Sequence, residues 1–305
     1  TYYPSEKIGG TSDRYKTFQM IDGVTIYGGF AGTETAVSQR TDYSFEGANQ
    51  TTLSGDFSAN DLISGSGSSL SISNNTENAY HVFYHPSGYT LTITALLDGF
   101  VIKGGNADGS GDRFNDGAGI YNYGGQDPTI NNCYFIGNDA EDNGGGIGNY
   151  GGSDATIKNS YFVKNISGVG STNGAGGGMI NYNSSPQIVN CLFYGNRSSG
   201  GDGDFGGAAY NTTNSEPEFV NCTCIGNYAR SGGAFYNNDN SDIFIRNCII
   251  YGNSKGSGVG PQIRNYDNSN ITISYSDVED YSSGGIYNSG GGSVIDGGGN
   301  IDSDP

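Results

Sequence analysis

Gly-Ala-Gly-Ile-Tyr-Asn, at residues 117–122, is the first of seven similar runs, the last of which ends at residue 288. Each run has a cluster of small residues, an apolar residue, one variable position and an asparagine. The closing residues are Asn122, Asn149, Asn181, Asn211, Asn237, Asn265 and Asn288, so the spacings are 27, 32, 30, 26, 28 and 23 residues. Such a recurring period indicates a chain built from stacked structural repeats.

A second signature, usually an asparagine followed by a small residue, lies between successive runs. It occurs as Asn132-Cys133-Tyr134-Phe135, Asn159-Ser160-Tyr161-Phe162, Asn190-Cys191-Leu192-Phe193, Asn221-Cys222-Thr223-Cys224 and Asn247-Cys248-Ile249-Ile250. Short alternations of polar and apolar residues, such as Thr129-Ile130, precede these signatures. Each unit of about 28 residues therefore holds two or three short strands separated by Gly, Asn and Pro turns.

Strands this short bury an apolar face only by stacking on the equivalent strands of the next unit, about 4.8 Å away. The sequence therefore predicts an all-β fold, a right-handed parallel β-helix (solenoid) with Gly/Asn-rich turns. Length divided by period gives about eleven coils, in a rod on the order of 50 Å long. We expect one domain over residues 1–305, with irregular first coils over 1–95, regular repeats over 96–290 and a last partial coil over 291–305.

The irregular first part contains predicted strands at residues 24–30, 51–56, 80–84 and 91–93. Between them, residues 36–49 and 56–75 are polar and are predicted to be loops inserted between coils.

Composition and charge exclude several functions. The 54 glycines would suit a disordered chain, but 23 tyrosines and recurring Phe, Ile and Val indicate an ordered, turn-rich β protein. With 31 acidic and 13 basic residues the formal charge is −18, which argues against nucleic acid and anionic membrane surfaces as partners. No apolar run is long enough for membrane insertion. The first residues do not form a signal peptide, so we expect that any such signal has been removed.

Equivalent residues of successive coils are expected to form columns. Two inward apolar columns are predicted: Ile120, Ile147, Met179, Ala209, Phe235, Ile263 and Ile286 in one, and Phe135, Phe162, Phe193, Cys224 and Ile250 in the other. The closing asparagines are expected to form a side-chain ladder at a turn. Cys133, Cys191, Cys222 and Cys248 share one repeat position with Ser160, which favours a buried Cys/Ser column; disulfides between coils are the alternative.

Eight tyrosines flank the closing asparagines and, by alternation along a strand, are expected to point to solvent. They are Tyr121, Tyr123, Tyr150, Tyr182, Tyr210, Tyr236, Tyr266 and Tyr287. Exposed aromatic faces beside Asn and Asp suit sugar rings, so these residues are predicted to bind a ligand. The alternative is that the stacked rings only stabilise the sheet.

Asp108, Asp112 and Asp116 lie in a glycine-rich loop, and oxygen-rich loops of this kind suit Ca²⁺. The alternative is a solvated acidic loop, since no full ligand pattern is present. No cofactor is otherwise required.

Runs such as Gly144-Gly145-Gly146-Ile147, paired with Phe-x-x-Asn at residues 135–138, 162–165 and 193–196, resemble the chlamydial-type polymorphic outer-membrane protein repeat. Nearly the whole chain is similar to bacterial secreted right-handed parallel β-helix proteins of the choice-of-anchor group. In that group a segment like residues 22–34 precedes one like residues 53–56. The resemblance implies an extracellular or cell-surface protein, often adhesive or carbohydrate-facing. Residues 299–305 resemble the middle of that family's last coils, so we expect the array to be cut short there.

The sequence therefore predicts a structural, adhesive or glycan-binding surface module, whose partner is an extracellular polysaccharide or a host or cell-surface molecule. One alternative is a polysaccharide lyase or glycoside hydrolase. For a lyase, Lys164, Arg197 and Arg230 form the best basic cluster. For a hydrolase, Asp139, Asp142, Asp202 and Asp204 are among too many carboxylates to choose between. The other alternative is a surface fibre, formed by self-association through the end coils.

Overall fold

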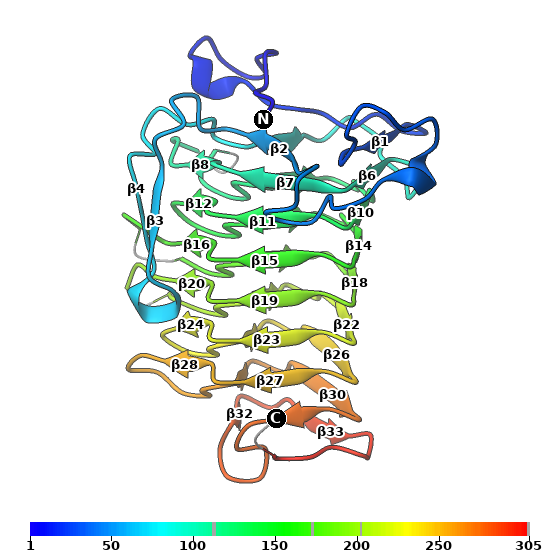
Figure 1. The fold of residues 1–305 in the computed structure, drawn as a ribbon. Coiled ribbons are helices and arrows are strands. Elements are labelled where there is room, and N and C mark those ends of the chain that lie inside the picture. Colours follow the sequence, from blue (N-terminus) through cyan, green and yellow to red (C-terminus); the bar gives the residue numbers. More distant parts are fainter. Residues whose placement is uncertain (112–113, 172–173, 202, 304–305) are drawn as a thin grey trace.

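The computed structural model describes residues 1–111, 114–171, 174–201 and 203–303. The chain winds into a solenoid in which each regular coil contributes one strand to each of four parallel sheets (Figure 1). We number these sheets 1 to 4 in the order in which the chain passes through them.

The strands of each sheet are stacked in register along the solenoid axis. Sheet 1 contains β1 (Thr25–Tyr27), β6 (Leu96–Asp98), β10 (Thr129–Asn131), β14 (Thr156–Lys158), β18 (Gln187–Val189), β22 (Glu218–Val220), β26 (Asp242–Arg246), β30 (Asn270–Ser274) and β33 (Val294–Asp296). Sheet 2 contains β2 (Thr51–Ser54), β7 (Phe100–Lys103), β11 (Tyr134–Ile136), β15 (Tyr161–Val163), β19 (Leu192–Tyr194), β23 (Thr223–Ile225), β27 (Ile249–Tyr251) and β31 (Asp277–Val278). Sheet 3 contains β8 (Asn106–Ala107), β12 (Asp139–Ala140), β16 (Ile166–Ser167), β20 (Arg197–Ser198), β24 (Tyr228–Ala229) and β28 (Ser254–Lys255). Sheet 4 contains β5 (Phe83–His85), β9 (Ile120–Tyr123), β13 (Ile147–Tyr150), β17 (Met179–Tyr182), β21 (Ala209–Thr212), β25 (Phe235–Asn237), β29 (Ile263–Asn265) and β32 (Ile286–Asn288).

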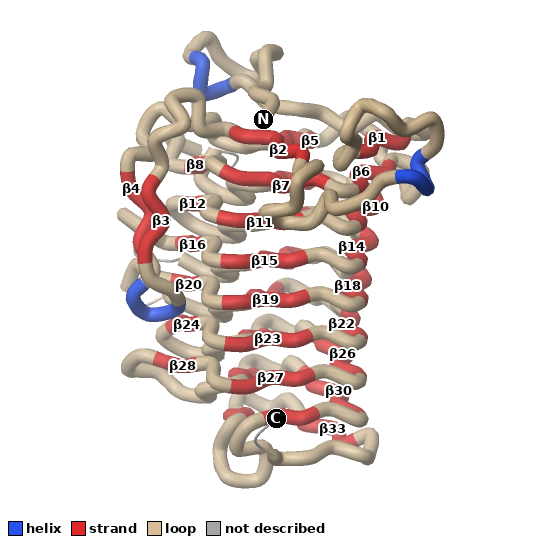
Figure 2. Tube along the Cα trace, viewed as in Figure 1, coloured by secondary structure: helices blue, strands red, loops and turns tan. Residues whose placement is uncertain are grey.

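Two insertions leave the array near its start. The first, the insertion loop (residues 29–50), carries the 3₁₀ helix η2 (Val37–Gln39). The second, the hairpin arm (residues 57–78), contains the antiparallel strands β3 (Leu62–Ser64) and β4 (Ser71–Ser73) with η3 (Gly67–Ser69) between them. The remaining 3₁₀ helix, η1 (Asp13–Tyr15), lies near the N-terminus. Figure 2 shows these three short segments as the helices drawn in the described chain, outside the stacked coils.

The predicted number of coils was too high. Among the described residues the largest sheet has nine strands, not eleven. Length divided by period overestimates the number because the insertion loop and the hairpin arm add residues but no coils. Two local predictions were also wrong: residues 56–75 form the hairpin rather than only a loop, and Leu91 makes a single bridge to Gln126 rather than starting a strand.

The second repeat signature marks a corner of each coil. Asn132, Asn159, Asn190, Asn221 and Asn247, at the turn from sheet 1 to sheet 2, have φ between 50° and 55°. Asparagine tolerates this left-handed conformation better than other non-glycine residues, which explains why it begins the signature.

Both predicted apolar columns are confirmed. The rings of Phe135, Phe162 and Phe193 are fully buried and stack at centroid distances of 4.8 and 4.6 Å, nearly parallel. Pairing places Cys224 and Ile250 in the same column. The column that begins at Ile120 is buried as far as Ile263, and Ile286 is half-buried. All five cysteines are buried and free, and four of them (all except Cys224) occupy the predicted Cys/Ser column.

The asparagine ladder is confirmed from Asn122 to Asn237, and Asn265 donates to Asn288 at 2.8 Å. Between these two parts the ladder is interrupted, because among the described residues the side-chain N–H of Asn237 has no partner. The ladder lies inside the strands of sheet 4 rather than at a turn. The side chains of Asn122 and Asn149 donate to the next asparagine over 3.0 Å, and the bonds continue through Asn181 and Asn211. His85 takes the asparagine position one coil earlier and contacts Asn122 Oδ1 at 2.8 Å through Nδ1. Burial lowers the pKa of His85 to about 4, so the imidazole is a neutral end to the ladder.

A second internal ladder lies at the corner between sheets 2 and 3. Asn138, Asn165, Asn196, Asn227 and Asn253 occupy it and are all buried. Each of the first four donates from both its backbone N–H and its side-chain amide to the next Oδ1. The repeated Asn of the Phe-x-x-Asn pattern is therefore structural.

Candidate functional site

The tyrosines of sheet 4 do not form one exposed column. Tyr121 is 2% exposed and Tyr236 is 6% exposed, so the expectation that they face solvent was wrong. Aromatic rings from adjoining loops and coils cover them: Phe205 lies 4.2 Å from Tyr236, and Tyr84 lies 5.7 Å from Tyr121. Alternation predicted the outward direction but not this second layer of rings.

The other predicted tyrosines fall into separate groups. Tyr182, Tyr266 and Tyr287 are exposed, whereas Tyr123, Tyr150 and Tyr210 are half-buried. Tyr150 and Tyr182 are stacked in register, but the next residue of that column is Thr212. The guanidinium of Arg264 lies over the rings of Tyr266 and Tyr287 at 4.9 and 4.5 Å. Sheet 4 thus offers short aromatic patches rather than a continuous surface.

The outer face of sheet 2 carries a more continuous surface. Residues there follow the inward Cys/Ser column and precede the inward phenylalanine column, so they point outward. The register places Tyr134, Tyr161, Leu192, Thr223 and Ile249 side by side, with Ile136, Val163, Tyr194, Ile225 and Tyr251 in a second row. Tyr134 and Tyr161 are stacked at 5.4 Å, and Tyr161 remains 47% exposed.

An external asparagine ladder borders this face at the corner with sheet 1. Asn159 donates to Asn131 at 2.9 Å, Asn190 to Asn159 at 3.1 Å and Asn221 to Asn190 at 3.1 Å. Asn247 continues the series by donating to Asn221 at 2.6 Å. Unlike the internal ladders, these amides are exposed to solvent.

The two insertions flank the face on opposite sides. Phe45 of the insertion loop stacks on Tyr134 at a centroid distance of 4.1 Å. Arg40 holds that loop through a buried ion pair with Asp98, 2.7 Å long, and through its position over the ring of Tyr43. On the other side, the hairpin arm runs along the solenoid axis beside the corner between sheets 2 and 3 (Figure 1). There the end of the Ile63 side chain of the arm packs over Gly137, and the φ of 64° at this position favours glycine.

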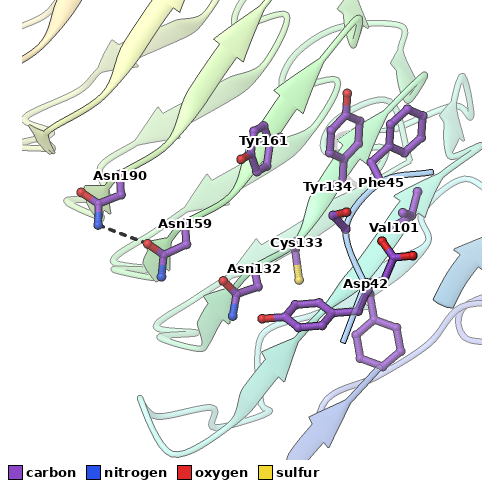
Figure 3. Close-up of a pocket in the computed structure, with 12 residues that line it drawn as sticks. Asp42, Phe45, Val101, Asn132, Cys133, Tyr134, Asn159, Tyr161 and Asn190 are labelled. Carbon is purple, nitrogen blue, oxygen red and sulfur yellow. Dashed lines mark hydrogen bonds between the residues drawn. The ribbon is translucent and has the colours of Figure 1, made fainter. Parts of the chain in front are cut away.

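The face contains two recesses. One, of about 630 Å³, lies beneath the insertion loop and includes Phe45, Tyr134, Tyr161, Asn132 and the ladder residues Asn159 and Asn190 (Figure 3). The other, of about 430 Å³, lies near the opposite end and includes Asn221, Asn247, Ile249 and Tyr275. Asn190 of the first recess and Asn221 of the second are hydrogen-bonded to each other, so the two recesses are adjacent along the external ladder. We call the whole surface the sheet 2 groove.

A family model described as the right-handed β-helix region matches residues 118–300. The chain belongs to the right-handed β-helix family. No curated protein and no solved structure matches it. The family therefore establishes the fold of this β-helix and its hand.

Two of the three basic residues predicted for a lyase form hydrogen bonds within this β-helix. Arg197 donates to the backbone oxygen of Leu70 in the hairpin arm at 2.8 Å, and Arg230 donates to Ser257 at 3.1 Å. Lys164 occupies a turn position with φ of 52°. The structure thus gives two of the three basic side chains a role in holding loops.

The carboxylates that a hydrolase would need are not paired in the recess beneath the insertion loop. Asp42 is the one carboxylate among its described lining residues. Asp139 is buried beside the hairpin arm, where burial raises its pKa to about 7, and Asp142 accepts a bond from Ser171 at 2.6 Å. Asp204 accepts from the backbone of Gly201, and Asp202 lies outside the described residues.

The acidic loop predicted to bind calcium is only partly described. Asp108 forms an ion pair with Arg14, Asp116 accepts two bonds from Asn143, and Asp112 lies outside the described residues. Burial raises the pKa of Asp116 to about 7. In the described part of the chain, no three His, Cys, Asp or Glu side chains form a group that could hold a metal ion.

The described residues also include no helix long and apolar enough to cross a membrane.

Proposed function

We propose that this β-helix is an extracellular or cell-surface module that binds a neutral polysaccharide along the sheet 2 groove. The observation that carries the proposal is the pairing of an exposed amide ladder with outward-facing aromatic and aliphatic side chains, of which Tyr161, Tyr194 and Ile249 are exposed. The likeness of its repeats to the polymorphic outer-membrane protein repeat supports the location.

The amide ladder offers unused hydrogen-bonding capacity at regular intervals. An asparagine amide has two N–H donors and an oxygen with two acceptor sites. Asn159 and Asn190 each donate one bond and accept one bond within the ladder. Each coil therefore leaves a donor and an acceptor for a ligand, repeated about every 4.8 Å. A polymer of hydroxyl-bearing units of similar length fits such a repeat.

The aromatic row supplies the apolar part of the contact. Tyr161 and Tyr194 are 47% and 40% exposed, and their rings offer flat surfaces for the C–H faces of sugar rings. Phe45 and Tyr134 close one end of the groove. Burial raises the pKa of Tyr134 to about 12, so its hydroxyl stays neutral.

The charge of the chain selects among polysaccharides. A net charge of −18 repels polymers that carry uronate or sulfate groups, and this repulsion is strongest at low ionic strength. Neutral glycans avoid this cost, which favours them as ligands.

Replacement of Tyr161 by alanine is expected to weaken binding of a neutral polysaccharide about tenfold, which corresponds to about 1.4 kcal/mol. Tyr182→Ala is the matched control, because Tyr182 is 44% exposed on sheet 4 and lies outside the groove. Affinity electrophoresis in gels that contain neutral or acidic polysaccharides measures both variants. Equal loss in the two variants, or a loss in Tyr182→Ala alone, rejects the groove as the binding surface.

The same incubations separate binding from cleavage. We expect retention of the protein without new reducing ends or unsaturated products. Formation of such products would favour the alternative of a polysaccharide-degrading enzyme.

A further inference from the structure

We propose that Asp61, Glu77 and Asn78 form a calcium-binding site at the foot of the hairpin arm. This site lies outside the sheet 2 groove and does not depend on glycan binding. Its role would be to fix the arm, which flanks that groove, against the solenoid.

The hairpin arm has a well-defined attachment at its tip. Gly67 donates its N–H to the backbone oxygen of Gly195 at 3.0 Å, and Arg197 donates to Leu70 O at 2.8 Å. These bonds tie the tip to coils that lie several repeats away from the arm in the sequence.

The foot of the arm is polar and buried. Asn78 is fully buried, and its side-chain N–H group donates to Asp61 Oδ2 at 2.9 Å. This bond fixes the orientation of the amide, because the opposite orientation would place its oxygen against the carboxylate. Nearby, Asn75 donates to Asp139 Oδ2 at 3.0 Å, which connects the foot to β12.

Four buried side-chain oxygens at the foot have no hydrogen-bond partner. They are Asp61 Oδ1, Glu77 Oε1, Asn78 Oδ1 and Asp139 Oδ1. All four are acceptors. A water molecule donates only two hydrogen bonds, so one water cannot satisfy even the first three, whereas a cation is attracted to every one of them.

The carboxylate of Asp61 also lacks a bound counter-charge. Burial, with a smaller contribution from Asp56 and Glu77, raises the pKa of Asp61 to about 6. Lys103 acts on Asp61 only through its longer-range charge, and no ion pair joins the two in the part of the chain that the structure describes.

The donor set favours calcium over other ions. Calcium binds carboxylate and amide oxygens in flexible geometry, whereas Mg²⁺ requires a nearly ideal octahedron and Zn²⁺ prefers His and Cys. Asn78 is essential to the set, because the acidic side chains alone do not form a three-residue metal group among the described residues. Asp139 interacts electrostatically with Asp61 and adds negative charge at the edge of the site.

Titration of the intact chain with CaCl₂ in a calorimeter tests the site. Three protein oxygens with two carboxylates predict weak binding, with a Kd on the order of 10⁻⁴–10⁻³ M, and a melting temperature that rises with Ca²⁺ concentration. MgCl₂ at the same ionic strength is expected to bind at least tenfold more weakly. No heat and no shift in melting temperature, or equal responses to both ions, overturns the proposal.

Four variants locate the ion. Asp61→Asn, which removes a ligand charge, and Asn78→Ala, which removes a ligand oxygen, are each expected to weaken calcium binding at least tenfold. Asp267→Asn removes the same charge from an exposed turn near the other end and is expected to leave binding unchanged. Circular dichroism confirms that each variant is folded. Binding that survives Asp61→Asn, or that is lost only in Asp108→Asn, places the ion elsewhere and overturns the proposal.

Limited proteolysis gives a second measurement, which reports on the arm itself. Calcium is expected to slow cleavage within residues 62–73 of the wild-type chain at least severalfold, and to have no such effect in Asp61→Asn. An equal effect in both proteins contradicts a site at the foot of the arm.

Discussion

Replacement of Asn196 by alanine is expected to lower the free energy of unfolding by about 5 kcal/mol. Asn196 is fully buried in the second internal ladder. Its Oδ1 accepts from the backbone N–H and the side chain of Asn165 at 2.9 and 3.1 Å, and its amide donates to Phe162 O and Asn227 at 2.8 and 2.9 Å. Alanine removes all these bonds and leaves buried polar groups without partners, each at a cost of about 1–3 kcal/mol.

The external ladder provides the control for this experiment. Asn190 also bonds to both neighbouring asparagines, but its side chain is exposed, so water replaces the lost bonds. In Asn190→Gly the glycine adopts the φ of 55° without strain, so we expect the free energy of unfolding to fall by less than about 1 kcal/mol. Urea denaturation followed by circular dichroism measures both variants. Similar losses in the two would contradict the distinction between internal and external ladders.

Phe162→Ala is expected to lower the free energy of unfolding by about 3–5 kcal/mol. The ring lies between those of Phe135 and Phe193 and is fully buried, so its removal leaves a cavity in the middle of the column. Coils contact only their neighbours in a solenoid, so the defect should also divide unfolding into two steps, one for each side of the array.

Phe162→Leu is the matched control, since leucine keeps most of the buried volume. We expect a loss of about 1–1.5 kcal/mol and a single unfolding transition. Both variants are compared by urea denaturation with circular dichroism. If Phe162→Ala lowers the free energy of unfolding by no more than Phe162→Leu does, the stacked phenylalanine column does not stabilise the array.

Much of the fold could be predicted because equivalent residues of successive coils recur along the sequence. Phe162 and Asn196 belong to residue series that recur once in each regular coil, as stacked columns require. The two insertions carry no period. The Ser-Ile-Ser strand of the arm therefore looked like a polar loop, and its pairing with β3 depends on the tertiary packing of the arm.

The candidate site was less predictable. From the sequence, Tyr121 and Tyr236 were predicted to point outward and to be exposed. The outward direction was correct, but rings from distant positions, such as Tyr84 and Phe205, bury both side chains. A signal for the sheet 2 groove was present. Tyr161 stands between Ser160 and Phe162, both assigned to inward columns, so alternation alone places it outward.

Tyrosine footprinting tests the central claim most directly. The protein is acetylated on its exposed tyrosines with and without a saturating neutral polysaccharide, and each residue is quantified by mass spectrometry. We predict that the polysaccharide protects Tyr161 and Tyr194 of the groove, while Tyr182 and Tyr287 of sheet 4 react as before. Protection of Tyr182 and Tyr287 with unchanged Tyr161 and Tyr194 would contradict the assignment of the binding surface to sheet 2.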